Sequence, residues 1–342
     1  MKQPLLKEIP LIDEFRFSYD QSTQFCTGFF YAFNTEIEIK LSCNTNTDYS
    51  DVEKTARAVF DLCRRYELLL SHKLEKSQIT SLNSAAGAMV EVSWETWEAL
   101  EAGKRFSALS EGCFDITMGA VTQLWDFSWG HIPETKEVIQ ALEHVDWRTV
   151  FLLDSSNILP ARYYAQLADP QASVDLGGVA KGLIADKIGE LLKNRGIACA
   201  FVNLGGNVTV YGTKPDGNAW VVGLRNPFNQ DILGAFSLRE GSVVTSGTYE
   251  RCFEANDMMY HHILDPQTGM PAVSDIASVT IISKQSLLGD GLSTTLLLWG
   301  FEKAYAFVEK TPSVEAIFVK ANGLVVPSKK AEDRLLLPSA AV

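Results

Sequence analysis

The stretch VDLGGVAKG at residues 174–182 decides most about the fold of this 342-residue chain. It reads as the end of a buried strand, a two-glycine turn and the start of a helix, because apolar residues then recur every three to four positions as far as Leu192. Gly196 predicts the C-terminus of that helix. Residues 198–204 follow as a second buried strand, which the sequence Gly-Gly-Asn at 205–207 interrupts. Helices packed against sheets are therefore expected.

The two glycine pairs each allow two interpretations. At 177–178, backbone N–H groups and the following helix N-terminus can hold an anion, or the glycines can serve close helix–sheet packing. The stretch matches neither a Walker A loop nor Gly-x-Gly-x-x-Gly. At 205–206, the glycines leave room for a flat ligand or mark a bulge.

Further elements follow from hydrophobic periodicity and turn residues. Strands outnumber helices, and no repeat or linker is evident. We expect residues 1–25 to form an irregular N-terminal extension, 26–330 a single domain and 331–342 a C-terminal tail. The predicted elements are a strand at 36–41, a helix opened by the capping box at 50–53 and ending near 71, a helix after 93, strands at 208–211, 220–224 and 279–282, a helix from 286 to Gly300, and a hairpin of 314–320 and 324–326.

Composition excludes several classes of protein. Hydrophobic residues make up 46% and charged residues 21% of the chain, which is typical of a soluble globular protein. The net charge of −12 argues against a nucleic-acid surface. Six scattered cysteines form no Cys-x-x-Cys pair, so we expect reduced thiols and no zinc cluster. The N-terminus lacks a secretory pattern and no apolar run is long enough for a transmembrane segment, which predicts a cytoplasmic protein.

Two of the five histidines lie side by side in the segment YHHILDPQTGMP, residues 260–271. Neighbouring side chains on a strand point to opposite faces, so His261 and His262 are expected to do different things. Histidine is the side chain best suited to proton transfer near neutral pH. The alternative is a packed or exposed pair beside an Asp-Pro turn.

A second candidate site lies in the segment LGDGLST, residues 288–294. If the segment is helical, Asp290 and Thr294 are one turn apart and share a face. A carboxylate and a hydroxyl in that arrangement suit a hard cation completed by carbonyl and phosphate oxygens. The alternative is a helix start with a capping aspartate. The hydroxyls at 245–248 are either part of a site or ordinary turn residues.

Taken together and in this order, these segments resemble the ApbE-type FAD:protein FMN transferases. The resemblance covers about residues 28–328, and the combination is specific although no single segment is. The matching segments are 35–39, 77–83, 114–119, 124–125, 175–182, 203–207, 245–247, 262–271 and 290–294. The resemblance implies an α+β, T-fold-like protein with mixed, mostly antiparallel sheets packed against helices and an FAD site between two lobes.

The resemblance also implies a function. Family members transfer FMN from FAD to a Thr or Ser hydroxyl of an acceptor protein and release AMP, with Mg²⁺ at the pyrophosphate. The acceptor carries a motif close to Ser/Thr-Gly-Ala-Ser/Thr, which does not occur in this chain. His262 is the implied general base, and Asp290, Thr294 and the carbonyl of Ala180 are the implied metal ligands. The implied flavin-binding residues are Asp115, Met118, Lys181, Gly205, Gly206, Asn207, Thr245 and Ser246.

The chain departs from the family pattern in four places. Phe33-Asn34-Thr35 replaces the usual Met-Gly-Thr, and Lys73 lies where an aromatic residue is usual. Thr248 replaces the usual acid, and Gly291 replaces an alanine. Hydrolysis of FAD to FMN and AMP in the same site therefore remains an alternative activity, and a non-catalytic FAD carrier is a further one.

Overall fold

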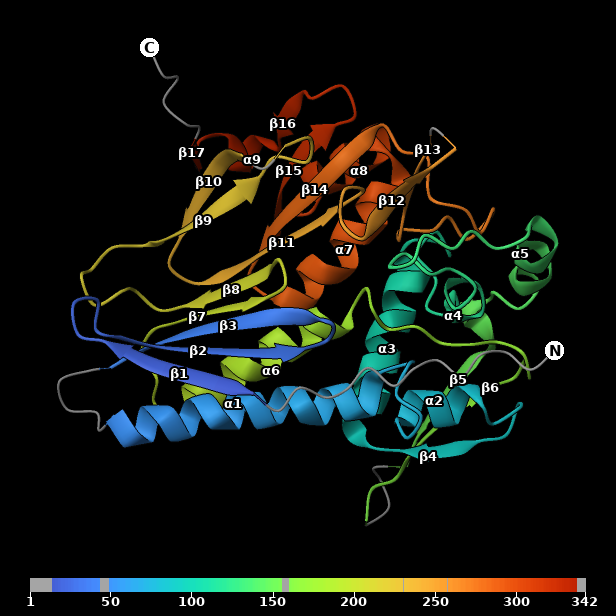
Figure 1. Ribbon diagram of the computed structural model, residues 1–342, viewed down its shortest axis with the longest axis horizontal. Coiled ribbons are helices and arrows are strands. Elements are labelled where there is room, and N and C mark those ends of the chain that lie inside the picture. Colours follow the sequence, from blue (N-terminus) through green and yellow to red (C-terminus); the bar gives the residue numbers. More distant parts are fainter. Residues whose placement is uncertain (1–13, 44–48, 156–159, 230, 257, 337–342) are drawn as a thin grey trace.

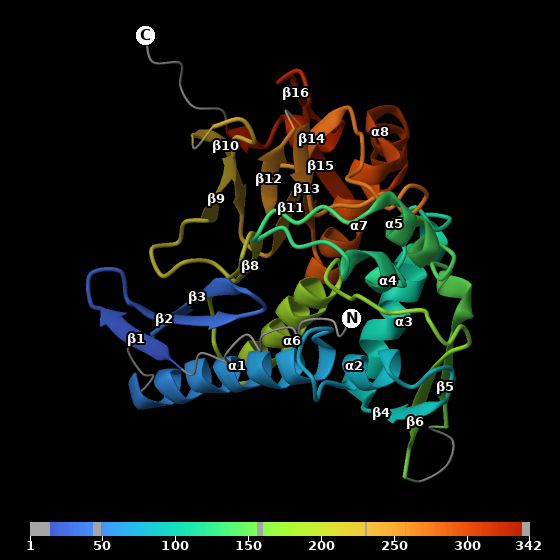
Figure 2. The ribbon, with the colours of Figure 1, turned by 45° about the vertical axis from the view of Figure 1, so that its right-hand side comes forward.

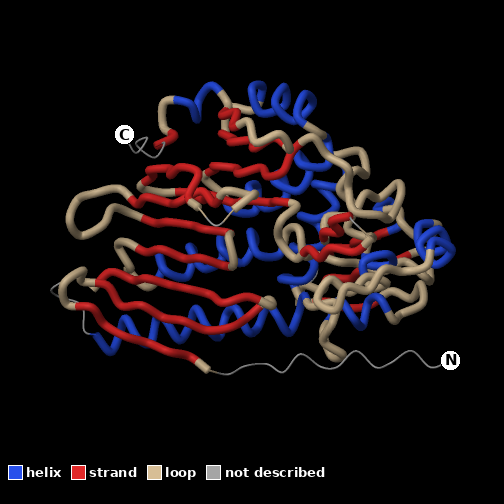
Figure 3. Tube along the Cα trace, turned by 45° about the horizontal axis from the view of Figure 1, so that its top comes forward, coloured by secondary structure: helices blue, strands red, loops and turns tan. Residues whose placement is uncertain are grey.

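The centre of the protein is a nine-stranded antiparallel sheet (Figures 1 and 3). The computed structural model describes residues 14–43, 49–155, 160–229, 231–256 and 258–336. The strand order is β1-β2-β3-β7-β8-β11-β14-β15-β16. Their bounds are Phe15–Asp20, Phe25–Ala32, Thr35–Ser42, Ala200–Leu204, Asn207–Tyr211, Gly241–Gly247, Ile276–Ser283, Val314–Lys320 and Val325–Pro327.

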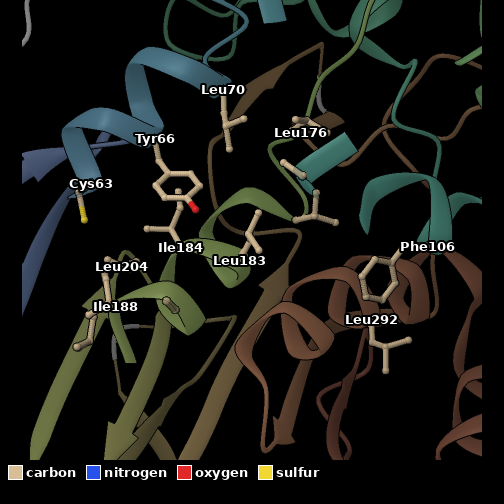
Figure 4. Close-up of a cluster of buried hydrophobic side chains, with 14 of the residues drawn as sticks. Cys63, Tyr66, Leu70, Phe106, Leu176, Leu183, Ile184, Ile188, Leu204 and Leu292 are labelled. Atoms are coloured by element: carbon tan, nitrogen blue, oxygen red, sulfur yellow. The ribbon is translucent and has the colours of Figure 1, made fainter. Parts of the chain in front are cut away.

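Four helices cover one face of this sheet: α1 (Tyr49–Leu70), α6 (Ala180–Asn194), α7 (Ser286–Trp299) and α8 (Phe301–Lys310). Ile184 and Ile188 are fully buried one turn apart on α6, and they meet Tyr66 of α1 and Leu204 of β7 in the core (Figure 4). Each such aliphatic side chain contributes about 1.5–3 kcal/mol by leaving water. The residues that α6 buries are thus the ones that recur with helical spacing in its sequence.

A small sheet, β17-β10-β9, packs its apolar side chains against the opposite face of the large sheet. Trp220, Val222 and Leu224 alternate inward along β9, as the strand period of two requires. A second small sheet, β4-β6-β5, lies with α2 and α3 at the other end of the molecule (Figures 1 and 2). The hairpin β12-β13 carries the histidine pair.

The remaining bounds are as follows. They are β4 Val90–Val92, β5 Val150–Asp154, β6 Tyr163–Leu167, β9 Trp220–Arg225, β10 Ile232–Leu238, β12 Cys252–Ala255, β13 Met258–His261, β17 Leu335–Leu336, α2 Gln78–Asn83, α3 Trp94–Leu109, α4 Gly119–Thr122, α5 Thr135–Leu142, α9 Lys329–Glu332 and the 3-10 helix Trp147–Thr149.

The contact between α6 and α7 positions the candidate site. Both carboxylate oxygens of Asp186 on α6 accept hydrogen bonds from the first N–H groups of α7, at Ser286 (2.8 Å) and Leu287 (3.0 Å). These groups have no partner within their own helix. A Cβ on Gly182 would lie 2.6 Å from the Ser286 carbonyl oxygen and 2.7 Å from the Asp290 Cβ. Only glycine therefore lets α6 approach α7 this closely.

Most predicted elements are confirmed. The α+β class and the mainly antiparallel sheets agree with the structure, since every strand ladder between the described residues is antiparallel. The helix 180–194 ends before Gly196, whose positive φ of 73° closes it. Ser93 caps α3, α7 ends at Gly300, and the C-terminal hairpin forms as expected.

Five local predictions are wrong. Residues 174–176, expected to end a buried strand, lie outside the strands, and the neighbouring Ser173 forms an isolated bridge with Met118. Within the extension expected to be irregular, residues 15–20 form β1 on β2, because Phe15 and Phe17 alternate inward; residues 1–13 lie outside the described part. In the expected tail, Leu335–Leu336 pair with β10. Helix α1 begins at Tyr49, so Ser50 lies within its first turn. Thr245 and Ser246 end strand β11 and do not lie on a turn.

No helix within the described ranges has both the length and the apolar character needed to cross a membrane.

Candidate functional site

His262 follows the last residue of β13, and a hydrogen bond to a backbone carbonyl holds its ring. Its Nδ1 lies 2.8 Å from the backbone carbonyl oxygen of Glu250. A carbonyl oxygen only accepts, so Nδ1 carries the proton and donates it. In the neutral ring, Nε2 is then the unprotonated nitrogen. This tautomer is the one that can receive a proton at Nε2.

The surroundings keep this ring neutral. The pKa of His262 is lowered to about 4, chiefly by burial and further by the cations of Arg251 and Lys181, against the opposing effect of the hydrogen bond to the Glu250 carbonyl. At neutral pH the ring is therefore uncharged and available as a base. Of the two neighbouring histidines, it is His262 whose pKa the charge of Lys181, at the start of α6, affects.

His261 has a different environment, as its position on the strand predicts. It is 6% exposed, and its Nε2 lies 3.2 Å from the carbonyl oxygen of Ala272. Its Nδ1 is buried and has no hydrogen-bond partner among the described residues. Burial also lowers the pKa of His261. This histidine packs the base of the hairpin against the segment that follows Pro271.

The glycine pair 205–206 is a two-residue hairpin turn between β7 and β8, and not a bulge. Leu204 pairs with Asn207, and the φ angles of Gly205 and Gly206 are 62° and 91°. Such a turn needs positive φ at both central residues, which glycine adopts without strain. A Cβ on Gly206 would lie 3.8 Å from a carboxylate oxygen of Glu250. The turn therefore lies beside the residue that orients His262.

Asn207 ties this turn to α7. It is 1% exposed, and its side-chain oxygen accepts a 2.7 Å hydrogen bond from the Ser286 hydroxyl. Its side-chain nitrogen is buried and finds no hydrogen-bond partner in the part of the chain that the structure describes. A buried amide N–H₂ without a partner is costly. Asn207 is thus a buried donor directly next to the glycine turn.

Asp290 and Thr294 lie on one face of α7, as their spacing predicts. Asp290 is 5% exposed and its Oδ2 accepts a 2.8 Å hydrogen bond from the backbone N–H of Gly182. It therefore does not cap its own helix, which excludes the alternative interpretation. Thr294 Oγ1 lies 3.2 Å from Ser246 Oγ, which in turn lies 2.8 Å from Ser293 Oγ.

The side chains around His262 and those around Asp290 both lie at the N-terminus of α6. Lys181 is electrostatically coupled to Glu250 and His262, whereas the next residue, Gly182, binds Asp290. Ala180, Asp290 and Thr294 offer a carbonyl, a carboxylate and a hydroxyl, all hard oxygen donors. No group of three or more His, Cys, Asp or Glu able to hold a metal occurs in the described residues. This donor set suits a cation that is completed by phosphate oxygens and water.

Three predicted flavin-binding residues have other partners. The Asp115 carboxylate accepts hydrogen bonds from the N–H and hydroxyl of Thr117 and from the Trp147 N–H, so it stabilises a turn. Met118 packs in an apolar cluster that includes Trp125. The Oγ1 atom of Thr245 on β11 lies 2.8 Å from Oγ1 of Thr280 on the neighbouring strand β14. Ser246, its neighbour on β11, points the other way and reaches α7.

Sequence reasoning gave no role to two residues of this region, although both lie in segments that it singled out. Glu250 follows the hydroxyl-rich segment. The group that orients His262 is the backbone carbonyl of Glu250, and no pattern of side chains in the sequence can reveal such a contact.

The carboxylate of Asp175 accepts hydrogen bonds from Gly177 N (2.8 Å) and Thr122 Oγ1 (3.2 Å), and His72 Nδ1 lies 3.3 Å from it. Burial opposes its ionisation, but His72 and these donors outweigh burial and hold its pKa below the usual range.

Comparisons with known proteins agree with this architecture. A model of the ApbE family matches residues 33–318. The FAD:protein FMN transferase of Treponema pallidum is 36% identical over 299 residues, covering 84% of this chain and 82% of the relative. The corresponding Klebsiella pneumoniae protein is 35% identical over 285 residues, covering 82% and 86%. The crystal structure of the Thermotoga maritima ApbE protein has a TM-score of 0.80 at 29% identity, covering 91% of this chain and 99% of that one.

Proposed function

The chain belongs to the ApbE family, and we propose that it transfers FMN from FAD to a Thr or Ser hydroxyl of an acceptor protein and releases AMP. The curated relatives at 36% and 35% identity are named FAD:protein FMN transferase, so they are transferases. The observation that carries the proposal is the neutral His262 with its proton fixed on Nδ1. That ring can take a proton from a hydroxyl nucleophile without first losing one of its own.

The reaction is a phosphoryl transfer. The acceptor oxygen forms a bond to the phosphorus of the FMN half, and the bond between that phosphorus and the bridging pyrophosphate oxygen breaks. The bridging oxygen leaves with AMP. His262 Nε2 receives the hydroxyl proton, while the Glu250 carbonyl keeps the ring oriented. Positioning and charge neutralisation supply most of the catalysis in such reactions.

The start of α6 supports binding of the pyrophosphate. Lys181 supplies a cation there, and the first N–H groups of a helix favour an anion. We propose that Asp290, Thr294 and the Ala180 carbonyl hold Mg²⁺, which when bound neutralises charge on the phosphates. Ser246 holds the Thr294 hydroxyl in place through the hydrogen bond between them.

The hairpin turn 205–207 is the proposed flavin site. Gly205 and Gly206 have no side chain that blocks a flat ring. The Asn207 amide, which has no hydrogen-bond partner within the described ranges, is a donor beside them. The proposed partner is a protein with a Ser/Thr-Gly-Ala-Ser/Thr-like segment, which this chain lacks.

One assay tests this function against its alternatives. The protein is incubated with FAD, Mg²⁺ and an acceptor domain that carries the motif, and the acceptor is analysed by intact mass and in-gel flavin fluorescence. We expect the acceptor to gain one FMN and AMP to appear in equal amount. AMP without modified acceptor indicates an FAD hydrolase, and tight FAD binding without AMP indicates a carrier. An acceptor whose hydroxyl residue is replaced by alanine is the control.

The pH dependence of transfer follows from the pKa of His262. Because that pKa is about 4 and not the usual 6.5, the free enzyme keeps a neutral base down to about pH 5. We expect kcat/KM to stay near its plateau between pH 7 and about 5 and to fall only toward pH 4, since kcat/KM reports the free enzyme. Arg251→Ala removes a cation that lowers this pKa, so its acid limb should move toward neutral pH. An unshifted limb near pH 6.5 in the wild type contradicts the assignment.

A further inference from the structure

Two cysteines outside the proposed site lie in contact at one edge of the large sheet. The Sγ atoms of Cys26 and Cys43 are 2.8 Å apart. Cys26 is on β2 and fully buried, whereas Cys43 directly follows β3 and is half-buried. A disulfide bond is about 2.05 Å long, so a small side-chain movement brings the two sulfurs to bonding distance. No second contact between cysteine sulfurs is found in the part of the chain that the structure describes.

The sheet fixes the backbone on both sides of this contact. Cys26 pairs with Leu41 in the antiparallel register of β2 and β3. Beyond the last named pair, the Cys43 N–H donates a 2.9 Å hydrogen bond to the Gln24 carbonyl oxygen. These backbone pairings place Cys26 and Cys43 diagonally across the two strands and on the same face of the sheet. The strand register therefore brings the two side chains within reach of each other.

We propose that Cys26 and Cys43 form a redox-sensitive disulfide that fastens β2 to the end of β3. The bond closes a segment of chain whose two ends are 17 residues apart. A cross-link of this length restricts the unfolded chain and so stabilises the folded one. All six cysteines are free thiols in the structure, as the sequence predicted. The sequence could not reveal the contact between Cys26 and Cys43, because it depends on the pairing of β2 with β3.

The reaction balances with a small disulfide such as oxidised glutathione as the oxidant. The half-buried Cys43 thiolate attacks the oxidant, forms a mixed disulfide and releases one glutathione thiolate. Cys26 then loses its proton and attacks the Cys43 sulfur, which releases the second glutathione. Two protein thiols are oxidised, one glutathione disulfide is reduced, and the released thiolates take up the two protons.

The slow step of disulfide formation is expected to be the attack by Cys26 on the mixed disulfide. Burial raises the pKa of this thiol, as do the neighbouring Cys43 and the carboxylate of Glu53. Tyr49 also faces the pair, and its own pKa is raised, chiefly by burial. Since the thiolate is the attacking form, closure of the disulfide should become faster as the pH rises.

The bond lies far from the proposed chemistry. The β2–β3 hairpin turns at Phe33 and Asn34, and Thr35 next to that turn contacts the glycine turn of the proposed flavin site. Cys43 lies at the opposite end of β3 from Thr35. Oxidation should therefore act on stability and leave FAD binding unchanged.

The test uses the full chain equilibrated with reduced or oxidised glutathione, alkylated, digested without reduction and analysed by mass spectrometry. We expect one cross-linked peptide pair that contains Cys26 and Cys43, lost on treatment with dithiothreitol. The melting temperature should rise on oxidation by on the order of 5 °C, and this rise should be absent in Cys43→Ser.

Cys113→Ser is the matched control, since Cys113 is also half-buried but contacts no other cysteine sulfur within the described residues. It should keep both the cross-link and the rise in melting temperature. The wild-type peptide map decides the proposal even where a variant folds poorly. Alkylation of both thiols after oxidation, or a stable glutathione adduct on Cys43 with Cys26 still free, overturns it.

Discussion

Replacement of His262 by alanine is expected to lower the rate of FMN transfer by about 10²–10⁴-fold, the usual contribution of a general base. The affinity for FAD should change little, because the hydrogen bond that the ring makes within the described residues joins it to the Glu250 carbonyl. Single-turnover transfer measured by acceptor mass gives the rate, and quenching of flavin fluorescence gives the affinity.

His261→Ala is the matched control for this variant. It removes the neighbouring imidazole, which bonds to the Ala272 carbonyl, so it should lower thermal stability and largely keep the rate. Added imidazole should restore part of the transfer rate in His262→Ala, because the small base can occupy the space that the ring leaves. A transfer rate in His262→Ala within about threefold of the wild type would show that another group takes the proton.

The sequence predicted the fold well where burial depends on local periodicity. The helix at 180–194 buries the residues that its own spacing selects, and β9 alternates as its sequence alternates. The prediction failed at residues 15–20, since a short strand at a sheet edge depends on its partner, β2, and on α1 beneath it. The same holds for Leu335–Leu336, whose strand exists only because β10 has a free edge.

For the site, spacing predicted which residues share a face but not what they contact. That Asp290 and Thr294 lie together follows from one helical turn. That Asp290 binds the Gly182 N–H depends on Asp186, which caps α7 from α6. No local pattern reveals such a contact between distant segments. Likewise, the sequence separated His261 from His262 by strand alternation, but the tautomer of His262 is set by a backbone carbonyl twelve positions away.

Asp290→Asn is expected to lower Mg²⁺-supported transfer by at least about 100-fold, the size of effect seen when one electrostatic contact to a transition state is lost. The amide oxygen can still accept the hydrogen bond from Gly182, so the contact between α6 and α7 is kept. What disappears is the negative charge and with it the strongest proposed cation ligand. A titration of the rate against Mg²⁺ should therefore show a much higher half-saturating concentration.

Asp186→Asn is the control that distinguishes loss of the cation ligand from weaker packing between α6 and α7. Asp186 also joins α6 to α7, but both of its oxygens accept N–H groups at the start of α7. The amide keeps one of these two acceptors, so the melting temperature should fall while activation by Mg²⁺ saturates as in the wild type. If Asp290→Asn behaves like Asp186→Asn, losing stability but not Mg²⁺ affinity, then Asp290 serves the packing of α7 and the cation must bind elsewhere.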